Sequence, residues 1–322
     1  MPTLRSLLSP IAWKERAIES AWAINPRGTT DPVTRTWPFD PALLKDVTIN
    51  WPDPSSYRFA PRRMLGDQIL AALRQYHRVR EMPIDQPYDG VVNFEFWRAG
   101  RRFRVILETS DYAELNEKAY ADADLHFKME FALTGYGTRD RLLPGGYVNA
   151  GPEIYHYLPR LRQIRDQAAP RYEVHGRFGL SMEKRRRPIE LLRAAKGFAF
   201  FGGEGKVRYR RFLEEVALSK VCIDLPSMSS VTFRMIDYLA IGCAVVGPPH
   251  TNRMIEPFQE GVHVTYCRPD YEDLEEVVVS LLRDEDRRRS LIANTRAFFD
   301  AVLHRKQLGS YYLHMCLKHL PS

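Results

Sequence analysis

Residues 223–247, IDLPSMSSVTFRMIDYLAIGCAVVG, decide the fold of this chain. An apolar strand ends in a loop of Pro and Ser, a helix is expected over 232–240, and a second apolar strand follows at 243–247. Ser229 or Ser230 can cap this helix at its N-terminus, and Gly242 can end it. A strand, a helix and a strand in this order are typical of a parallel βαβ unit.

The same alternation continues on both sides of this stretch. The expected strands cover 171–176, 197–201, 221–225, 243–247 and 262–266, and the expected helices cover 187–195, 209–218 and 232–240, with a further helix beginning at 270. After residue 286, another helix carries apolar residues on one face. Short apolar strands that alternate with amphipathic helices predict a Rossmann-like domain with a parallel sheet.

The chain has 322 residues, which suits two domains at roughly 150 residues each. The segment 167–170, QAAP, is the best boundary because it follows a charged helical pattern and precedes a new strand. We therefore expect a GT-B-like division, with an N-terminal α/β domain at 1–170, a Rossmann-like domain at 171–300, and a C-terminal helix at 301–322 that packs back on the first domain. In the N-terminal half, the expected strands are 46–49, 90–96, 103–108 and 125–127, and the expected helices are 61–76 and 111–120.

Composition excludes several classes of protein. Hydrophobic residues make up 44% and charged residues 27%, so the chain is neither collagen-like nor disordered. No apolar run reaches the roughly 18 residues that span a bilayer, and no secretory leader is visible, which predicts a cytoplasmic protein. The four cysteines lack metal-site or redox spacing and are expected to be reduced thiols of the core.

The net charge of +7 is concentrated in one segment. Residues 177–211 contain eleven basic and three acidic residues, whereas the rest of the chain is close to neutral. This predicts a localised anionic partner, which could be a diphosphate, a nucleic acid backbone or an acidic membrane surface. The alternative is a solvated basic helix face.

The start of the helix at 232–240 is a candidate anion site. In an open parallel sheet, ligands bind beyond the carboxyl ends of the strands, where helix N-termini stabilise negative charge. Ser229, Ser230 and Thr232 could hold a phosphate, and Arg234 could bind it with two parallel hydrogen bonds.

Here the sequence resembles the C-terminal, donor-binding half of GT-B glycosyltransferases. Residues 233–246, FRMIDYLAIGCAVV, are similar to the family's helix that ends in Ala-x-Gly before a short apolar strand, and 256–262, EPFQEGV, resembles the loop before the last strand of that domain. The resemblance covers roughly 171–299 and includes the glycosyl transferase group 1 and exostosin-like families. It implies a glycosyltransferase of the hexosyltransferase type, with a nucleotide-sugar donor in this domain and an acceptor in the N-terminal domain.

The resemblance also implies roles for particular residues. Asp237 matches the acidic residue that binds the donor's ribose in many relatives. Many retaining members carry a Glu eight positions earlier, where this chain has Ser229, so the stereochemistry is left open. Arg234 on this helix is similar to the exostosin-like branch and is expected to act in catalysis as well as in donor binding.

Further cations near the first strand of this domain resemble diphosphate ligands of the family. Arg177, Lys184 and Arg187 are the candidates, with Arg185 and Arg186 expected to be solvated. Fixed cations and a helix N-terminus can stabilise the departing diphosphate, so no metal and no cofactor are expected. Asp122 and Asp124 have the spacing of a metal motif, but between a helix and a strand they are interpreted as turn residues.

A base for the acceptor hydroxyl would have to come from the N-terminal domain. Asp111, in the loop after the strand at 103–108, is the first candidate, and Glu108 and His126 are others. The alternative for Asp111 is the N-cap of the helix expected at 111–120, and the alternative for His126 is a core histidine. His250 could contact the donor or only support its loop.

Several partners and functions stay open at this point. The acceptor could be a glycan, a lipid-linked group or another hydroxyl compound, and the apolar and basic pattern at 4–16 could also rest on a membrane. A second hypothesis is a nucleic-acid-binding protein that would use the 177–211 segment, with a glycosyltransferase acting on DNA as one form of it. A third is a GT-B-like scaffold without catalysis.

Overall fold

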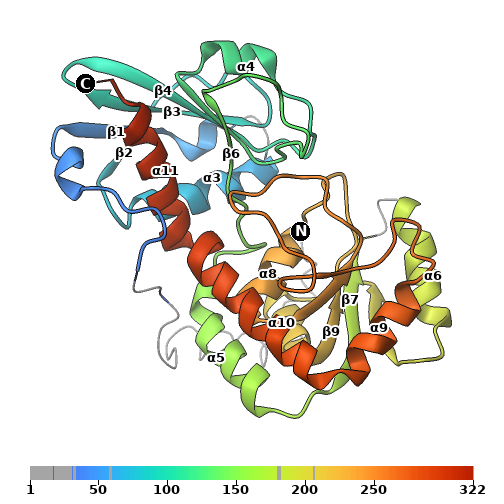
Figure 1. The fold of residues 1–322 in the computed structure, drawn as a ribbon. Coiled ribbons are helices and arrows are strands. Elements are labelled where there is room, and N and C mark those ends of the chain that lie inside the picture. The colour runs from blue at the N-terminus through green and yellow to red at the C-terminus, as the bar shows by residue number, and fades with distance from the viewer. Residues whose placement is uncertain are drawn as a thin grey trace, which may run out of the picture.

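The computed structural model describes residue 17, residue 31 and residues 34–57, 60–179, 183–205 and 207–321. Two β-sheets, each accompanied by helices, form two lobes (Figure 1). This arrangement confirms the predicted α/β class with two Rossmann-like domains. The apolar and basic segment 4–16 lies outside the described residues, so its contact with a membrane stays a prediction.

The C-terminal sheet contains five parallel strands. They are β7 (Tyr172–Phe178), β8 (Phe200–Glu204), β9 (Ser219–Ile223), β10 (Ala244–Gly247) and β11 (Thr265–Tyr266), in the order β11-β10-β9-β7-β8. Strand β11 keeps only two residues of the expected 262–266. Val174 of β7 pairs with Phe200 on one side and Val221 on the other, so β7 is an interior strand. Because β8 and β9 flank β7 on opposite sides, the strand order reverses at the carboxyl ends of β7 and β9, where open α/β sheets bind ligands.

Helices connect these strands as the alternation predicted. They are α6 (Arg186–Ala194), α7 (Tyr209–Ala217), α8 (Phe233–Ile241), α9 (Leu274–Arg283) and α10 (Glu285–Phe298). Gly242, with φ of +90°, ends α8 as expected because a residue without Cβ adopts this conformation readily. The prediction for the other end was wrong: Thr232, not Ser229 or Ser230, caps α8 by accepting a hydrogen bond from Met235 N at 3.1 Å.

The N-terminal sheet is mixed. Its strands are β1 (Val47–Pro52), β2 (Val79–Met82), β3 (Val91–Arg98), β4 (Arg101–Glu108), β5 (Leu125–Lys128) and β6 (Leu142–Pro144), in the order β2-β1-β3-β4-β5-β6. Strands β4, β5 and β6 are parallel, whereas β3 is antiparallel to both of its neighbours. The carboxyl ends of β4 and β5 therefore lie at the same edge of the sheet.

The helices of this half are α3 (Ala60–Leu73), α4 (Glu117–Asp122) and α5 (Ile154–Gln167). The helix expected at 111–120 was placed wrongly, because residues 111–114 form bends and α4 begins only at Glu117. Asn116 caps α4 by accepting a hydrogen bond from Ala119 N. Residues 109–116 are thus a loop at the edge where β4 ends.

The last helix, α11 (Arg305–His319), lies along α3 (Figure 1). The two helices approach closely at Gly309, where a Cβ would lie 2.4 Å from Ala72 O. The Tyr76 hydroxyl also donates to Lys306 O at 2.8 Å. A continuous apolar core joins the N-terminal sheet to α8 and α11, and the division at residues 170 and 300 stays a prediction.

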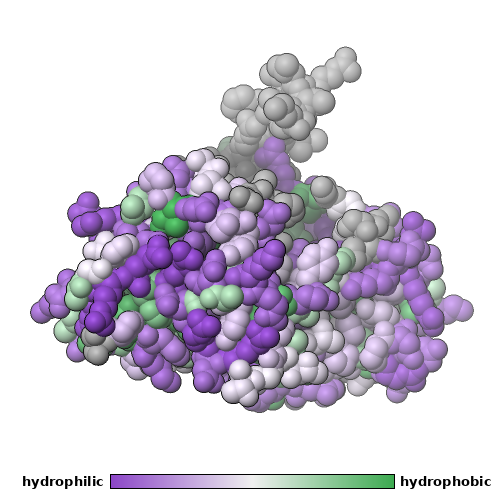
Figure 2. All heavy atoms as spheres, turned by 90° about the horizontal axis from the view of Figure 1, so that it is seen from above, coloured by the Kyte–Doolittle hydropathy of each residue, from purple (hydrophilic) through white to green (hydrophobic). Residues whose placement is uncertain are grey.

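The face seen in Figure 2 is mainly hydrophilic, with apolar residues in small scattered groups. Helices of the described chain are all too short or too polar to cross a membrane. The four cysteines are buried and free, which confirms their prediction as core thiols.

Candidate active site

A pocket of about 640 Å³ opens at the carboxyl end of the C-terminal sheet. It lies where β7 and β8 end and where α7 and α8 begin. Its lining residues are Ala150, Arg177, Phe178, Gly179, Glu204, Gly205, Val207, Tyr209, Phe212 and Arg234. Because α8 follows β9, the pocket borders the point between β7 and β9 where the strand order reverses, and its position and volume suit a small-molecule site.

Arg234 lines this pocket from the first turn of α8. Its guanidinium carbon lies 5.6 Å from the centre of the Phe178 ring. Its Nε and Nη2 atoms are buried and have no hydrogen-bond partner among the described residues. Buried donors without a partner cost roughly 1–3 kcal/mol each. The unpaired donors, together with the positive end of the α8 dipole, make this corner a site for an anion.

Arg185 is a second cation beside this corner, although its solvation had been predicted. Its side chain is buried and donates to Leu225 O at 3.0 Å, to Pro226 O at 2.9 Å and to Gly179 O at 3.2 Å. Burial, together with the charge of nearby Arg234, lowers the pKa of Arg185 to about 10. Arg185 therefore holds the loop that leads from β9 toward α8.

Arg187 and Lys184 are both exposed, unlike Arg185. The Arg187 side chain is 65% exposed and lies 3.7 Å from Glu272, and neither residue lines the pocket. Partial burial lowers the pKa of Lys184, with a contribution from Arg185. The relative burial expected for Arg185 and Arg187 was thus wrong, because the turn at 183–185 directs Arg185 inward.

Arg177 lines the pocket from β7 in a fixed orientation. Its Nε and Nη2 atoms donate to the Glu215 carboxylate at 2.5 and 3.0 Å, and His175 Nε2 lies 3.4 Å from the same group. The hydrogen bonds from His175 and Arg177 outweigh burial and lower the pKa of Glu215 to about 2. Glu215 therefore holds the Arg177 side chain in one orientation, and its negative charge partly neutralises the positive charge of Arg177.

Asp237 is fully buried and does not line the pocket. Its Oδ1 accepts hydrogen bonds from Asn149 Nδ2 at 2.9 Å and from the Tyr209 hydroxyl at 2.8 Å. Burial raises the pKa of Asp237 to about 7. Asp237 thus supports Tyr209, which does line the pocket, and a contact between Asp237 and a ribose stays a prediction.

Ser229 Oγ donates to Val231 O at 2.6 Å and also hydrogen-bonds Glu130 of the N-terminal lobe, so its side chain does not cap α8. Ser230 donates to Asn252 Oδ1, and Asn252 in turn donates to both Glu130 and the Tyr147 hydroxyl. Tyr147 also donates to Glu130 Oε1 at 2.7 Å. The loop before α8 is therefore hydrogen-bonded, through Asn252, to a carboxylate of the N-terminal lobe.

Glu130 was not among the predicted residues. It is buried just beyond the carboxyl end of β5. Burial raises its pKa to about 7 despite hydrogen bonds from Tyr147, Asn252 and Ser229, and the charge of Asp111 adds to the rise. Carboxyl groups with a strongly raised pKa are common in active sites. The sequence signal that could have indicated it is an acidic residue two positions after an apolar strand.

Glu130 is expected to make the protein less stable as pH rises. The pKa of Glu130 is about 7 in the fold and 4.5 in an unfolded chain. The stability that the protonated Glu130 carboxyl gives to the fold is therefore complete below pH 4.5 and is lost as pH rises through 7. This amounts to at most about 3 kcal/mol. Urea unfolding between pH 5 and 8.5 should therefore show a shallower pH dependence for Glu130→Gln than for the wild type. Glu117→Gln, at a side chain that is 64% exposed, is the control and should keep the wild-type slope. The same pH dependence of the unfolding free energy in all three proteins would contradict a raised pKa for Glu130.

Asp111 lies in the loop after β4, near enough to Glu130 for its charge to act on that group. Since α4 begins at Glu117 with Asn116 as its cap, the N-cap interpretation of Asp111 is wrong. The structure therefore places Asp111 and Glu130 at the same edge of the N-terminal sheet.

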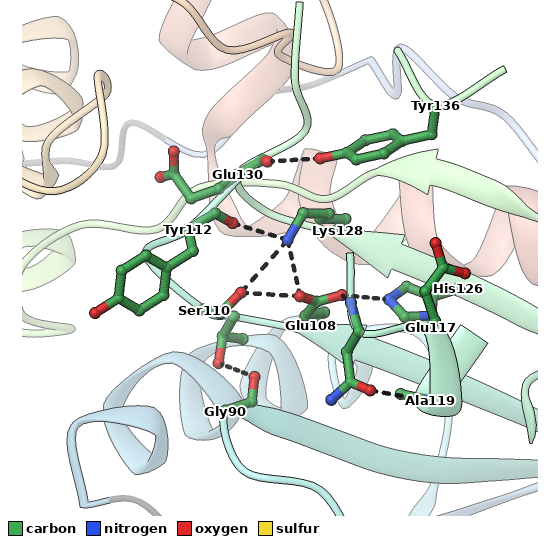
Figure 3. A network of polar contacts seen from close by, with 12 residues as sticks. Gly90, Glu108, Ser110, Tyr112, Glu117, Ala119, His126, Lys128, Glu130 and Tyr136 are labelled. Atoms are coloured by element: carbon green, nitrogen blue, oxygen red, sulfur yellow. Dashed lines mark hydrogen bonds and ion pairs between the residues drawn. The ribbon is translucent and has the colours of Figure 1, made fainter. Parts of the chain in front are cut away.

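A buried ionic cluster holds this loop in place (Figure 3). Glu108 accepts hydrogen bonds from Lys128 Nζ at 2.8 Å and lies 3.0 Å from His126 Nε2, and all three side chains are at most 3% exposed. Lys128 also donates to Tyr112 O at 2.9 Å. Hydrogen bonds and charges from His126 and Lys128 outweigh burial and lower the pKa of Glu108 to about 2. Glu108 and His126 are thus structural supports of the loop that carries Asp111.

Breaking this cluster is expected to destabilise the protein strongly. Lys128→Met leaves the Glu108 charge buried without its closest cation, and such changes cost about 3–5 kcal/mol. Lys118→Met, at an exposed position of α4, is the matched control. Equilibrium urea unfolding measures both variants. If Lys128→Met and Lys118→Met lost equally little unfolding free energy, the buried pair of Lys128 and Glu108 would not stabilise the fold as described. Adding Glu108→Gln to Lys128→Met should recover part of the loss.

The basic segment 177–211 is largely ion-paired. Pairs with glutamates involve Arg177, Arg186, Arg187, Arg193, Arg210 and Arg211. Phe198 is buried in the core, as expected for a strand. These pairs neutralise part of the charge, and binding of nucleic acid by this segment stays a prediction.

The other candidates have local partners. Asp122 accepts a hydrogen bond from the Tyr88 hydroxyl, and Asp124 accepts one from Arg104 N at 2.6 Å. Within the described part of the chain, no group of three His, Cys, Asp or Glu side chains could hold a metal. His250 lies 2.9 Å from the Tyr266 hydroxyl, and burial lowers its pKa to about 4.

Comparison with known proteins agrees with this geometry. Residues 161–305, which carry the C-terminal sheet and the pocket, match the model of a family described as glycosyl transferase-like. No curated protein matches the chain significantly. Residues 161–305 are therefore a GT-B-like glycosyltransferase domain.

Proposed function

We propose that the protein transfers a hexose from a nucleotide sugar to a hydroxyl group. The single observation that carries this proposal is Arg234, whose unpaired donors lie in the pocket at the N-terminus of α8. The diphosphate of the donor would bind there, with Arg177 as a second cation. Serines 229 and 230 and Thr232 would shape the loop around it, whereas Lys184 and Arg187 would act only at longer range.

The reaction would be a displacement at the anomeric carbon. The acceptor oxygen forms the new bond to this carbon, its proton passes to a carboxylate, and the bond from carbon to the diphosphate oxygen breaks. The electron pair of that bond stays on the nucleoside diphosphate. Asp111 is the proposed base, and Arg234 and the α8 N-terminus stabilise the leaving group, so that no metal is needed.

The acceptor would approach from the N-terminal lobe. A glycan, a lipid-linked group or another hydroxyl compound would suit this side, where Glu130 hydrogen-bonds Ser229 of the loop before α8 and Asp111 lies near enough for its charge to act on Glu130. We place this activity in the cytoplasm, with contact to a membrane surface through the segment 4–16 where the acceptor is lipid-linked.

A thermal-shift screen tests the proposal. UDP, GDP, dTDP, CMP and their sugars are added to the wild type and to Arg234→Ala, first with EDTA and then with magnesium. A ligand at 100 times its Kd stabilises a protein by about 2.7 kcal/mol. We expect a shift with one nucleotide family in EDTA, lost in Arg234→Ala and kept in Arg186→Ala, whose side chain is 62% exposed outside this pocket. A shift that requires magnesium would contradict metal independence, and a full shift in Arg234→Ala would contradict the site.

A further inference from the structure

The pocket that we assign to an anionic donor also contains a carboxylate. Glu204, the last residue of β8, is the acidic residue among the described lining residues. Its side chain is 42% exposed. A carboxylate repels a diphosphate, so we expect Glu204 to face a part of the ligand other than the diphosphate. The walls between the two are apolar and aromatic, with Phe178, Val207 and Phe212 among them.

The orientation of Glu204 is supported by its neighbours. Arg193 Nη1 lies 3.3 Å from Glu204 Oε1. The guanidinium passes over Gly203, where φ is +78° and a Cβ would lie 3.0 Å from Arg193 Nη2. A Cβ at Gly202 would lie 2.1 Å from Gly176 O, so both glycines allow the end of β8 to lie close to β7 and Arg193. The contact with Arg193 is made by Glu204 Oε1.

Arg234 and Glu204 together would set the orientation of a nucleotide bound in the pocket. With the diphosphate at Arg234, the base is the part of the nucleotide that reaches Glu204, and it would lie against the aromatic wall. An ionised carboxylate can only accept hydrogen bonds. Guanine presents two adjacent donors, N1–H and N2–H, which match the two carboxylate oxygens. Uracil and thymine present one donor flanked by two carbonyl oxygens, which a carboxylate repels, and adenine and cytosine present a single amino group.

We infer that the pocket selects a guanine nucleotide, with Glu204 accepting hydrogen bonds from N1 and N2 of the base. This inference rests on the proposed nucleotide site and names the donor as a guanosine diphosphate sugar. A site built to bind a particular donor group rejects analogues that lack it. Glu204 is then the specificity residue and Arg193 its positioning residue.

Calorimetric titration with GDP, IDP and UDP tests the inference. IDP is the same purine without the 2-amino group. The wild type should bind GDP at least about 10-fold more tightly than UDP, with IDP between them. Glu204→Gln should remove most of the preference for GDP by weakening the binding of GDP, while the affinity for UDP should stay the same or rise because the charge that repels the uracil carbonyl oxygens is gone. Glu214→Gln, which alters a carboxylate that pairs with Arg210 at 2.9 Å outside the pocket, is the control and should keep the preference.

The outcomes separate the two claims. Tighter binding of UDP than of GDP, or an unchanged preference in Glu204→Gln, would overturn the guanine assignment, while weakened binding of both nucleotides in Arg234→Ala would still support the nucleotide site. Equal affinities for GDP and IDP would overturn the contact with N2. Absence of binding of any nucleotide to folded wild-type protein would overturn the proposed function together with the inference.

Discussion

Arg234→Ala is expected to lower kcat/KM for sugar transfer by about 1,000-fold. The guanidinium is the cation with unpaired buried donors in the pocket, and negative charge grows on the diphosphate as the glycosidic bond breaks. The loss should appear in donor affinity and in kcat, because the interaction strengthens in the transition state. The kcat/KM of Arg234→Lys should lie between the values of the wild type and Arg234→Ala, because an ammonium keeps the charge but loses the planar pair of donors.

Stability should not fall in this variant. Arg234 makes no hydrogen bond through Nε or Nη2 to the described residues, and the repulsion between its charge and that of Arg185 opposes its attraction to the buried carboxyl groups of Asp224 and Asp237. We therefore expect an unfolding free energy close to that of the wild type, measured with urea in the absence of nucleotide. A large loss of stability would show that Arg234 is a structural residue. A wild-type kcat/KM would remove it from the site.

Asp111→Asn is expected to lower kcat by roughly 100- to 10,000-fold, the range that general base catalysis supplies. The amide keeps the size of the side chain but cannot take the acceptor's proton. The Kd for the donor nucleotide should stay unchanged, because the donor pocket is lined largely by the C-terminal lobe. Initial rates at saturating donor, together with a nucleotide titration, separate the two effects.

The control for Asp111→Asn lies in the same loop. Glu114→Gln makes the same chemical change at an exposed position and should keep kcat. If Asp111→Asn also kept kcat, the base would not be Asp111, and the neighbouring carboxyl of Glu130 would be the next group to change. A loss of donor affinity equal to the loss of kcat would indicate that the loop had moved rather than that a base had been removed.

The C-terminal lobe could be predicted well from the sequence because its signals are local. Strands buried on both faces appear as continuous apolar runs, and Gly242 marks the end of α8 directly. The N-terminal lobe gives weaker signals. Strand β2 has three exposed residues out of four, and β6 has only three residues, so neither shows a clear alternation.

The site was predictable only in part, for a similar reason. Arg234 follows a recognisable helix start, so its position could be inferred from neighbouring residues. Glu130 could not, since its partners Tyr147 and Asn252 are 17 and 122 positions away in the sequence. The contrast between buried Arg185 and exposed Arg187 depends on how one short turn faces the loop after β9, which no local pattern encodes.

The most direct measurement of the central claim is a crystal structure of the protein with a bound nucleoside diphosphate. The account predicts density for the β-phosphate beside the Arg234 guanidinium and the first turn of α8, with the base extending toward β8. Density for the diphosphate on the exposed cations of α6, or anywhere outside the pocket lined by Arg177 and Arg234, would contradict it.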